Sequence, residues 1–218
     1  MSGAHLWAIP PFLLALTVHE FAHGLIAEKF GDPTARMMGR ITLNPLPHID
    51  PIGTIILPAF LIIVRSPFIF GWAKPVPVNP FNLRDPKRDM IWISLAGPVA
   101  NLIFAFVCGL VLRVSLLFSS SGPLVVMLAW AVIIGLVLAA FNLIPIPPLD
   151  GSGILKGLLP DRMQEGYAKY ERFGFIILLG LFTIGQPIIA LFVFPFVGIF
   201  SWLFTGKTMF YVLGLIGL

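Results

Sequence analysis

An apolar run at residues 8–30 carries three ionisable side chains in its interior, His19, Glu20 and His23, besides Glu28 and Lys29 at its end. The run opens with two prolines and closes at a Gly-Asp-Pro sequence, which is punctuation typical of a single helix. At about 20 residues it is long enough to cross a hydrocarbon layer roughly 30 Å thick. Ionisable groups inside a membrane helix are costly and mark functional positions. The run therefore predicts a membrane-spanning helix that carries a functional site.

The spacing of the three side chains fits a zinc site. His19 and His23 are four residues apart, so on a helix they share one face and can both reach one Zn²⁺ at about 2.0–2.1 Å. Glu20 is rotated by about 100°, which brings it near a water molecule on the metal without making it a ligand. This H-E-x-x-H pattern is typical of metalloproteases whose Glu is the general base. The alternative is a chance match of two buried histidines, in a chain that has only four.

Composition indicates a membrane protein. The chain is 58% hydrophobic and only 11% charged, whereas soluble domains carry about 25% charged residues. We expect one membrane-embedded domain, residues 1–218, with no appended soluble domain. The lipid bilayer is therefore an expected partner of this domain. The net charge of +4 does not indicate nucleic-acid binding, because basic residues of membrane proteins gather in cytoplasmic loops. The oligomeric state is left open by the sequence.

The predicted fold class is an all-α polytopic membrane protein with about five or six transmembrane or re-entrant segments. Residues 91–117 and 124–144 are clear spans. Residues 51–64 are too few to cross, and we expect them to dip into the membrane and return. Residues 173–204 form either one kinked helix or a hairpin of two. The domain divides into a catalytic core at about residues 8–160 and C-terminal helices at about residues 173–218.

A small β-strand or hairpin element is expected near residues 40–80. This stretch mixes β-branched residues with Asn, Pro and Gly, and its alternation around Val76 and Val78 favours a short strand. Pro75 and Pro77 lack the N–H that a central strand needs, so the strand would lie at an edge.

The positions of the basic residues predict the topology. If residues 51–64 dip and return, the loops at residues 28–50, 65–90 and 146–172 share one side and collect all of the 14 lysines and arginines except Arg113 and Lys207. The positive-inside rule then places these loops in the cytoplasm and the N-terminus outside.

A catalytic zinc site needs a third protein ligand, and the candidates are His5, His48, Asp50 and Asp150. Asp150 follows a proline-rich run that prevents further helix. Non-helical backbone at membrane depth is tolerated where it is buried or lines a cavity. Asp150 could instead belong to an ordinary Asp-Gly turn. His48 and Asp50 stay open as alternative ligands, although a position near the site entrance or hydrogen bonds to the backbone suit them better. His5 fits an interfacial position.

Three motifs together resemble the site-2 protease family of intramembrane zinc metalloproteases: HEFAH at 19–23, LAGPVANL at 95–102 and NLIPIPPLDG at 142–151. The resemblance implies that His19, His23 and Asp150 bind one Zn²⁺ and that Glu20 is the general base. It also implies that Asn142 helps to hold the substrate carbonyl or oxyanion. Many members carry PDZ or CBS domains, which this compact sequence lacks, so the resemblance implies nothing about regulation.

The resemblance extends to the substrate and the location. The sequence GWAKPVPVNP at 71–80 is similar to the edge strand that pairs with unwound substrate in this family. The implied substrate is a transmembrane-helix protein, cleaved in a bacterial or other prokaryotic plasma membrane at a site that opens towards the cytoplasm. The rival hypotheses are a metal or ion transporter, whose translocation path would use the same ionisable residues, and an inactive zinc-binding membrane protein. Transporters often contain inverted repeats, and none is evident here.

Overall fold

The computed structural model describes residues 3–64 and 71–217 of the 218-residue chain. Across these residues the secondary structure is helical and no β-strand is present. In chain order the elements are η1 (Gly3–Ala8), α1 (Ile9–Lys29), α2 (Thr34–Met37), η2 (Leu46–His48), η3 (Pro51–Ile56), α3 (Leu57–Ile63), η4 (Pro80–Asn82), α4 (Pro86–Phe118), α5 (Pro123–Asn142), α6 (Asp150–Leu158), α7 (Asp161–Glu171), α8 (Gly174–Thr183), α9 (Gln186–Thr205) and α10 (Met209–Leu215).

Within the described residues, four helical segments are long and apolar enough to cross a membrane: Leu6–Lys29, which includes α1, and the helices α4, α5 and α9. The predicted spans at residues 8–30, 91–117 and 124–144 correspond to α1, α4 and α5. The expected count of five or six segments is not confirmed. The apolar helices η3–α3 and α8 are shorter than the roughly 20 residues that a crossing needs.

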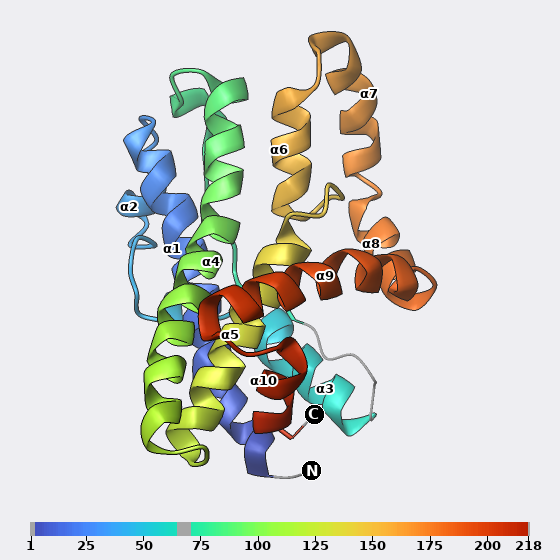
Figure 1. The fold of residues 1–218 in the computed structure, drawn as a ribbon. Helices are drawn as coiled ribbons and strands as arrows, with labels where there is room; N and C mark the ends of the chain where they lie inside the picture. Colours follow the sequence, from blue (N-terminus) through green and yellow to red (C-terminus); the bar gives the residue numbers. More distant parts are fainter. Residues whose placement is uncertain (1–2, 65–70, 218) are drawn as a thin grey trace.

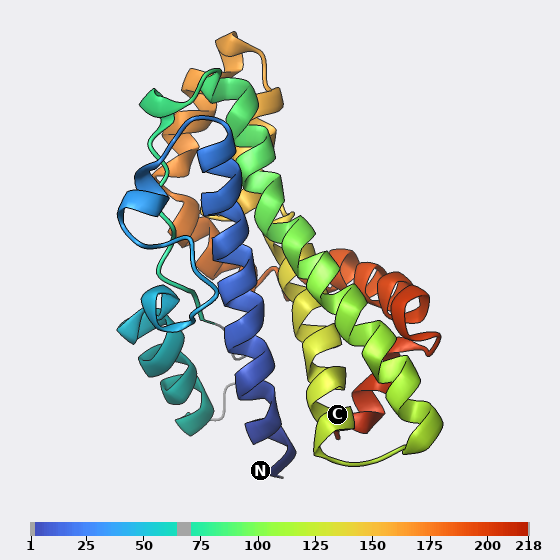
Figure 2. The same ribbon diagram turned by 90° about the vertical axis from the view of Figure 1, so that its left-hand side faces the viewer.

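The helices α1, α4 and α5 pack side by side, and α9 crosses the bundle at a steep angle to α4 and α5 (Figures 1 and 2). The main apolar core lies where α4, α5, α9 and α10 meet and includes Leu112, Val132, Leu136 and Val212, none of which is exposed. Apolar side chains cover much of the outer surface as well. This is what a chain surrounded by lipid requires.

The two ends of the bundle differ in the elements that they carry. The C-terminal end of α1, the start of α4 and the α6–α7 hairpin lie at one end, the upper one in Figure 1. The connection between α4 and α5 and the helix α10 lie at the opposite end in both views. From α2 the chain descends through η3 and α3 to the level of the N-terminal half of α1, and residues 71–79 lead back up to η4 (Figure 2).

The β element expected near residues 40–80 is absent from the described part of this stretch, so that prediction is wrong there. Residues 71–79 have no helix and no strand partner. Their backbone donors are instead used by neighbouring loops and by the carboxylates of α1 and its C-terminal turn. Pro75 and Pro77 have no N–H to offer a ladder. An alternating sequence forms a strand only when another strand lies beside it, and sequence alternation alone does not report that neighbour.

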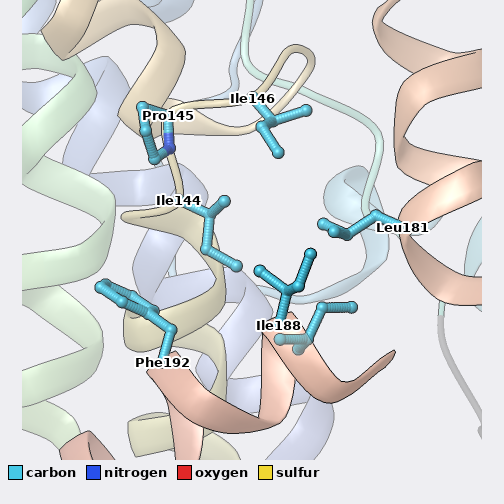
Figure 3. A pocket seen from close by; sticks show the side chains of 7 residues that line it. Ile144, Pro145, Ile146, Leu181, Ile188 and Phe192 are labelled. Atoms are coloured by element: carbon cyan, nitrogen blue, oxygen red, sulfur yellow. The ribbon is translucent and has the colours of Figure 1, made fainter. Parts of the chain in front are cut away.

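The apolar stretch at residues 173–204 is a hairpin of two helices, α8 and α9, that separate at Ile184 and Gly185. A small apolar cavity of about 280 Å³ lies where this hairpin meets the turn after α5 (Figure 3). Leu181, Ile188 and Phe192 face Ile144 and Ile146 across it. The hairpin therefore approaches the same turn that leads to Asp150.

Candidate metal centre

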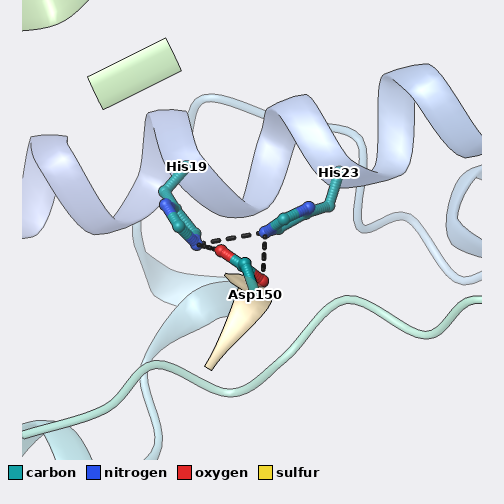
Figure 4. Close-up of side chains that lie close together, drawn as sticks. All are labelled: His19, His23 and Asp150. Atoms are coloured by element: carbon teal, nitrogen blue, oxygen red, sulfur yellow. Dashed lines mark hydrogen bonds and ion pairs between the residues drawn. The ribbon is translucent and has the colours of Figure 1, made fainter. Parts of the chain in front are cut away.

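The helix α1 places two imidazoles on one face. Two prolines occupy its first turn, where a missing N–H costs nothing. His19 and His23 are four residues apart on this helix, and both rings project from the same side of it (Figure 4). His19 is 7% exposed. Both histidines lie within a segment that is long and apolar enough to span a membrane.

The turn after α5 delivers Asp150 to these rings. The prolines between Ile144 and Leu149 end the helix, and α6 starts at Asp150. Gly151 lies so close to this turn that an added Cβ would be 2.4 Å from the Leu143 carbonyl oxygen. A larger residue at position 151 would therefore displace the start of α6, and with it Asp150, from the turn after α5.

The three side chains converge on one point (Figure 4). Nε2 of His19 is 3.0 Å from Nε2 of His23 and 3.1 Å from Oδ2 of Asp150, and Nε2 of His23 is 3.4 Å from Asp150 Oδ1. Ligands about 2.0–2.1 Å from a tetrahedral zinc ion are about 3.3 Å apart. The buried Oδ2 of Asp150 has no hydrogen-bond partner within the described chain. This donor set and its spacing fit Zn²⁺.

His19, His23 and Asp150 form a cluster, and contacts behind the two imidazole rings determine which nitrogen of each ring faces it. Nδ1 of His23 is 2.7 Å from the Ile93 carbonyl oxygen of α4, which only accepts, so this nitrogen carries the proton and Nε2 presents its lone pair. Nδ1 of His19 is 3.1 Å from the amide of Asn101, also on α4. Asn101 is fully buried and its Oδ1 has no partner in the described structure. Rotating the amide by 180° lets Oδ1 accept the His19 proton.

Gly97 lets α4 pass directly beside the imidazoles. A Cβ built on Gly97 would be 2.4 Å from His23 Nε2 and 2.5 Å from His19 Cε1. Any side chain at this position would collide with the cluster. The small-residue patch of α4, which is the part of the LAGPVANL motif around Gly97, is therefore part of the site's architecture.

Glu20 lies beside the cluster and is hydrogen-bonded to the extended segment at residues 71–79. Its Oε2 accepts a hydrogen bond of 2.8 Å from the backbone N–H of Val76. The extended segment can approach α1 this closely because Gly24, one turn further along the helix, leaves room for the Val76 side chain. Glu20 is outside the group of three metal-binding atoms.

A large cavity of about 1230 Å³ opens over the cluster. Its walls are mostly apolar and come from α1, α4, α5, α8, α9, the turn that leads into α6 and the segment at residues 71–78. His19, Glu20, His23 and Asp150 all line it. The space is of the size that proteins use for drug-sized or peptide ligands, which is roughly 300–1,000 Å³ and above.

Asn142 lines the same cavity at the C-terminal end of α5. One hydrogen of its Nδ2 is donated to the Leu138 carbonyl oxygen at 3.0 Å. An amide nitrogen carries two hydrogens, so one remains for another acceptor.

The alternative ligands do not join the cluster in the described structure. His48 is buried with Nε2 3.0 Å from the Thr42 carbonyl oxygen, and Asp50 accepts from the backbone N–H groups of Ile52 and Gly53 at the start of η3. The side chain of His5 lies outside the described part.

The Asp150 carboxyl has opposing influences on its ionisation. Burial raises the pKa of the Asp150 carboxyl, but the facing imidazoles of His23 and His19 stabilise the carboxylate and hold that pKa below its usual range. The carboxylate form is the one that binds metal.

Sequence reasoning missed three contributors. The Ile93 carbonyl and the Val76 N–H are backbone groups, for which the residue type gives no signal. Asn101 is a polar side chain of α4 whose partner on α1 is His19, a residue of the cluster. A polar residue buried in a span beside a small-residue patch is the signal that could have found it.

Comparison with known proteins identifies relatives. The sequence model of peptidase family M50 matches residues 117–184, which include Asn142 and Asp150. The chain is 42% identical to YwhC of Bacillus subtilis, covering 78% of this chain and 77% of YwhC. It is 32% identical to Rip2 of Mycobacterium tuberculosis H37Rv, covering 83% of this chain and 68% of Rip2. It is 24% identical to MJ0392 of Methanocaldococcus jannaschii, covering 91% of this chain and 50% of MJ0392. The names of all three describe zinc metalloproteases. No solved structure matches.

Proposed function

Because the chain belongs to peptidase family M50, the site-2 protease family of zinc metalloproteases, we propose that it hydrolyses peptide bonds within or near the transmembrane helices of other membrane proteins. The observation that carries the proposal is the convergence of Asp150, at the start of α6, with His19 and His23, which lie in a helix long enough to span the membrane. In this proposal the three side chains hold one zinc ion and Glu20 is the general base.

Each residue has a distinct part in the proposed reaction. Bound zinc supplies a Lewis acid that lowers the pKa of water to about 7 and polarises a carbonyl. Glu20 takes the proton of the attacking water on its carboxylate and later delivers it to the leaving amine. The second Nδ2 hydrogen of Asn142 is available to the developing oxyanion. Ile93 and Asn101 keep the two imidazoles oriented with Nε2 towards the metal.

The proposed substrate is a transmembrane helix that has locally unwound. The carbonyls of an intact helix are occupied by i→i−4 hydrogen bonds, so a helix must open before it can be attacked. The apolar walls of the 1230 Å³ cavity suit the side chains of such a segment. Residues 71–76 offer it an extended backbone to pair with, which is recognition by β-augmentation. Helix-breaking residues in the substrate should therefore favour cleavage.

The protein is an integral membrane protein, and its orientation is part of the proposal. The end of α1, the start of α4 and the α6–α7 hairpin share one end of the bundle (Figure 1) and carry basic residues such as Lys29, Arg88 and Arg162. By the positive-inside rule this end faces the cytoplasm. The bacterial origin of YwhC and Rip2 supports a bacterial plasma membrane.

The test is cleavage of a single-span substrate with a destabilised helix by the protein reconstituted in lipid. We expect Glu20→Gln to lose activity by about 10²-fold or more while retaining zinc. The matched control is Glu28→Gln, which removes a carboxylate near the C-terminal end of the same helix that pairs with Arg36. Equal processing by wild type and Glu20→Gln would contradict the role of Glu20. Zinc-loaded protein that cleaves nothing while zinc crosses sealed vesicles would establish the transporter instead. Bound zinc with neither activity would establish an inactive relative.

A further inference from the structure

Between Trp72 and Val76, the extended segment that lines the cavity is bonded to the rest of the described structure along one edge only. The backbone groups of every second residue are paired: Trp72 N–H with Gly53 O (3.1 Å), Trp72 O with the Thr54 hydroxyl (2.8 Å), Lys74 N–H with His48 O (2.9 Å), Lys74 O with Arg40 (2.6 Å), and Val76 N–H with Glu20 (2.8 Å). In extended backbone, successive residues direct their N–H and C=O groups to opposite edges. The edge formed by Trp72, Lys74 and Val76 is therefore closed.

The opposite edge is open. Neither the N–H and C=O of Ala73 nor the C=O of Pro75 has a hydrogen-bond partner among the residues that the structure describes. Both residues line the cavity that contains the cluster. Pro75 has no N–H, so at this position the open edge accepts a hydrogen bond and donates none.

We propose that Pro75 is a specificity-determining residue that makes the open edge hold substrate through substrate N–H groups while leaving the facing substrate carbonyl free. The inference deepens the proposed function and rests on it. In an antiparallel pair, two opposed residues exchange both bonds, so an ordinary residue at position 75 would draw the substrate carbonyl into the ladder. Opposite Pro75 the substrate gives its N–H and its carbonyl has no donor on the edge. That carbonyl is free to turn towards the cluster.

The position of Pro75 matches this role. The next residue, Val76, is the one whose N–H holds Glu20. Adjacent Cα atoms are about 3.8 Å apart, so a substrate residue that pairs with Pro75 is held one residue away from the contact to the base. The same segment thereby carries the base on its closed edge and the substrate on its open edge, and the register of one relative to the other is fixed.

The first experiment compares Pro75→Ala with Pro77→Ala. Both substitutions restore an N–H and remove one proline ring from the same segment, but Pro77 is absent from the cavity wall, so it controls for loss of rigidity. We expect Pro75→Ala to lower kcat by about tenfold, the scale of one misplaced hydrogen bond, with KM unchanged or lower. Pro77→Ala should stay within about twofold of wild type on the same scale. Zinc content and thermal unfolding should be unchanged in both.

The second experiment measures binding without turnover. A fluorescent peptide matching the destabilised stretch of the test substrate is bound to the Glu20→Gln protein, and its amides are N-methylated one at a time. N-methylation should weaken binding by about tenfold at two positions that are two residues apart, and not at the position between them. Equal effects of Pro75→Ala and Pro77→Ala, or loss of binding without this alternation, would overturn the inference. Failure of the proposed function is distinguishable, since a wild-type protein without protease activity can still show the alternating pattern.

Discussion

The side-chain amide of Asn101 lies 3.1 Å from Nδ1 of His19, across the contact between α4 and α1. Metal binding through Nε2 requires a proton on Nδ1, and the Oδ1 of Asn101 is the buried acceptor at hand. The helix α4 therefore contributes an outer shell to a cluster whose residues come from α1 and α6.

Replacing Asn101 should weaken zinc binding. We expect Asn101→Leu to lower zinc affinity by about 10–100-fold, measured by competition with a chromogenic chelator. The control is Thr17→Val, which removes a buried hydroxyl of α1 that bonds only to the Leu13 carbonyl. If both variants bind zinc as tightly as wild type, Asn101 has no positioning role.

A methyl group at Gly97 should displace the imidazoles. Its Cβ would fall within 2.7 Å of three ring atoms of His19 and His23, so Gly97→Ala is expected to lose most bound zinc and cleavage activity. Gly198→Ala is the matched control, because nothing lies within 4 Å of a Cβ there and alanine favours the helix. Zinc content after purification is the measurement. Stoichiometric zinc in Gly97→Ala would show that α4 can move away at little cost.

Asp32 should make stability depend on acidity. It is fully buried after α1 and accepts hydrogen bonds from Thr34, Asn79 and Asn82. Burial raises the pKa of Asp32, but these hydrogen bonds outweigh it and leave the pKa below its ordinary value. The stabilisation is therefore complete above the unfolded pKa of about 3.9 and is lost as pH falls through the lower folded pKa.

The variant Asp32→Asn tests this. At neutral pH it should lower the free energy of unfolding by about 1–3 kcal/mol, and the difference from wild type should shrink below about pH 4. Unfolding transitions recorded in detergent at several pH values give both quantities. Asp161→Asn, an exposed carboxylate paired with Lys87, should change little at any pH. A constant difference between Asp32→Asn and wild type would exclude the linkage.

Removing the Asn142 amide should slow the chemical step. If its free hydrogen serves the oxyanion, Asn142→Ala lowers kcat by about 10²–10³-fold with little change in KM. Steady-state cleavage of the reconstituted test substrate separates the two constants. Asn44→Ala, in a loop outside the cavity wall, is the control. A change confined to KM would assign Asn142 to substrate binding.

The helices were predictable to different degrees. Hydropathy and the flanking prolines located α1, α4 and α5 because membrane spans are a local property of sequence. The stretch at residues 173–204 allowed two outcomes, since Gln186-Pro187 can either kink a helix or begin one. In the structure it begins α9, and the two helices pack against the turn after α5. The prediction of a β element was wrong because backbone N–H groups of residues 71–79 donate to partners outside any sheet.

The site was predictable where its geometry is local. The juxtaposition of His19 and His23 follows from helical spacing alone. The contribution of Asp150 depends on how α6 docks near α1, and the residues alone left His48 and Asp50 as alternatives. The structure brings Asp150 to the histidines, and its role as a ligand stays a prediction. The contacts of Ile93 and Asn101 depend on where α4 crosses α1, which no local pattern encodes.

The approach of α6 to α1 has a thermodynamic consequence. His19 and Asp150 are separated by more than half of the chain, so an ion that binds both acts as a cross-link between distant parts of the polypeptide. The unfolded chain has no such site, and binding free energy is therefore also folding free energy. The population of folded molecules should rise with free zinc concentration by mass action. For this protein, metal supply to the cell would govern how long each molecule survives as well as how fast it works.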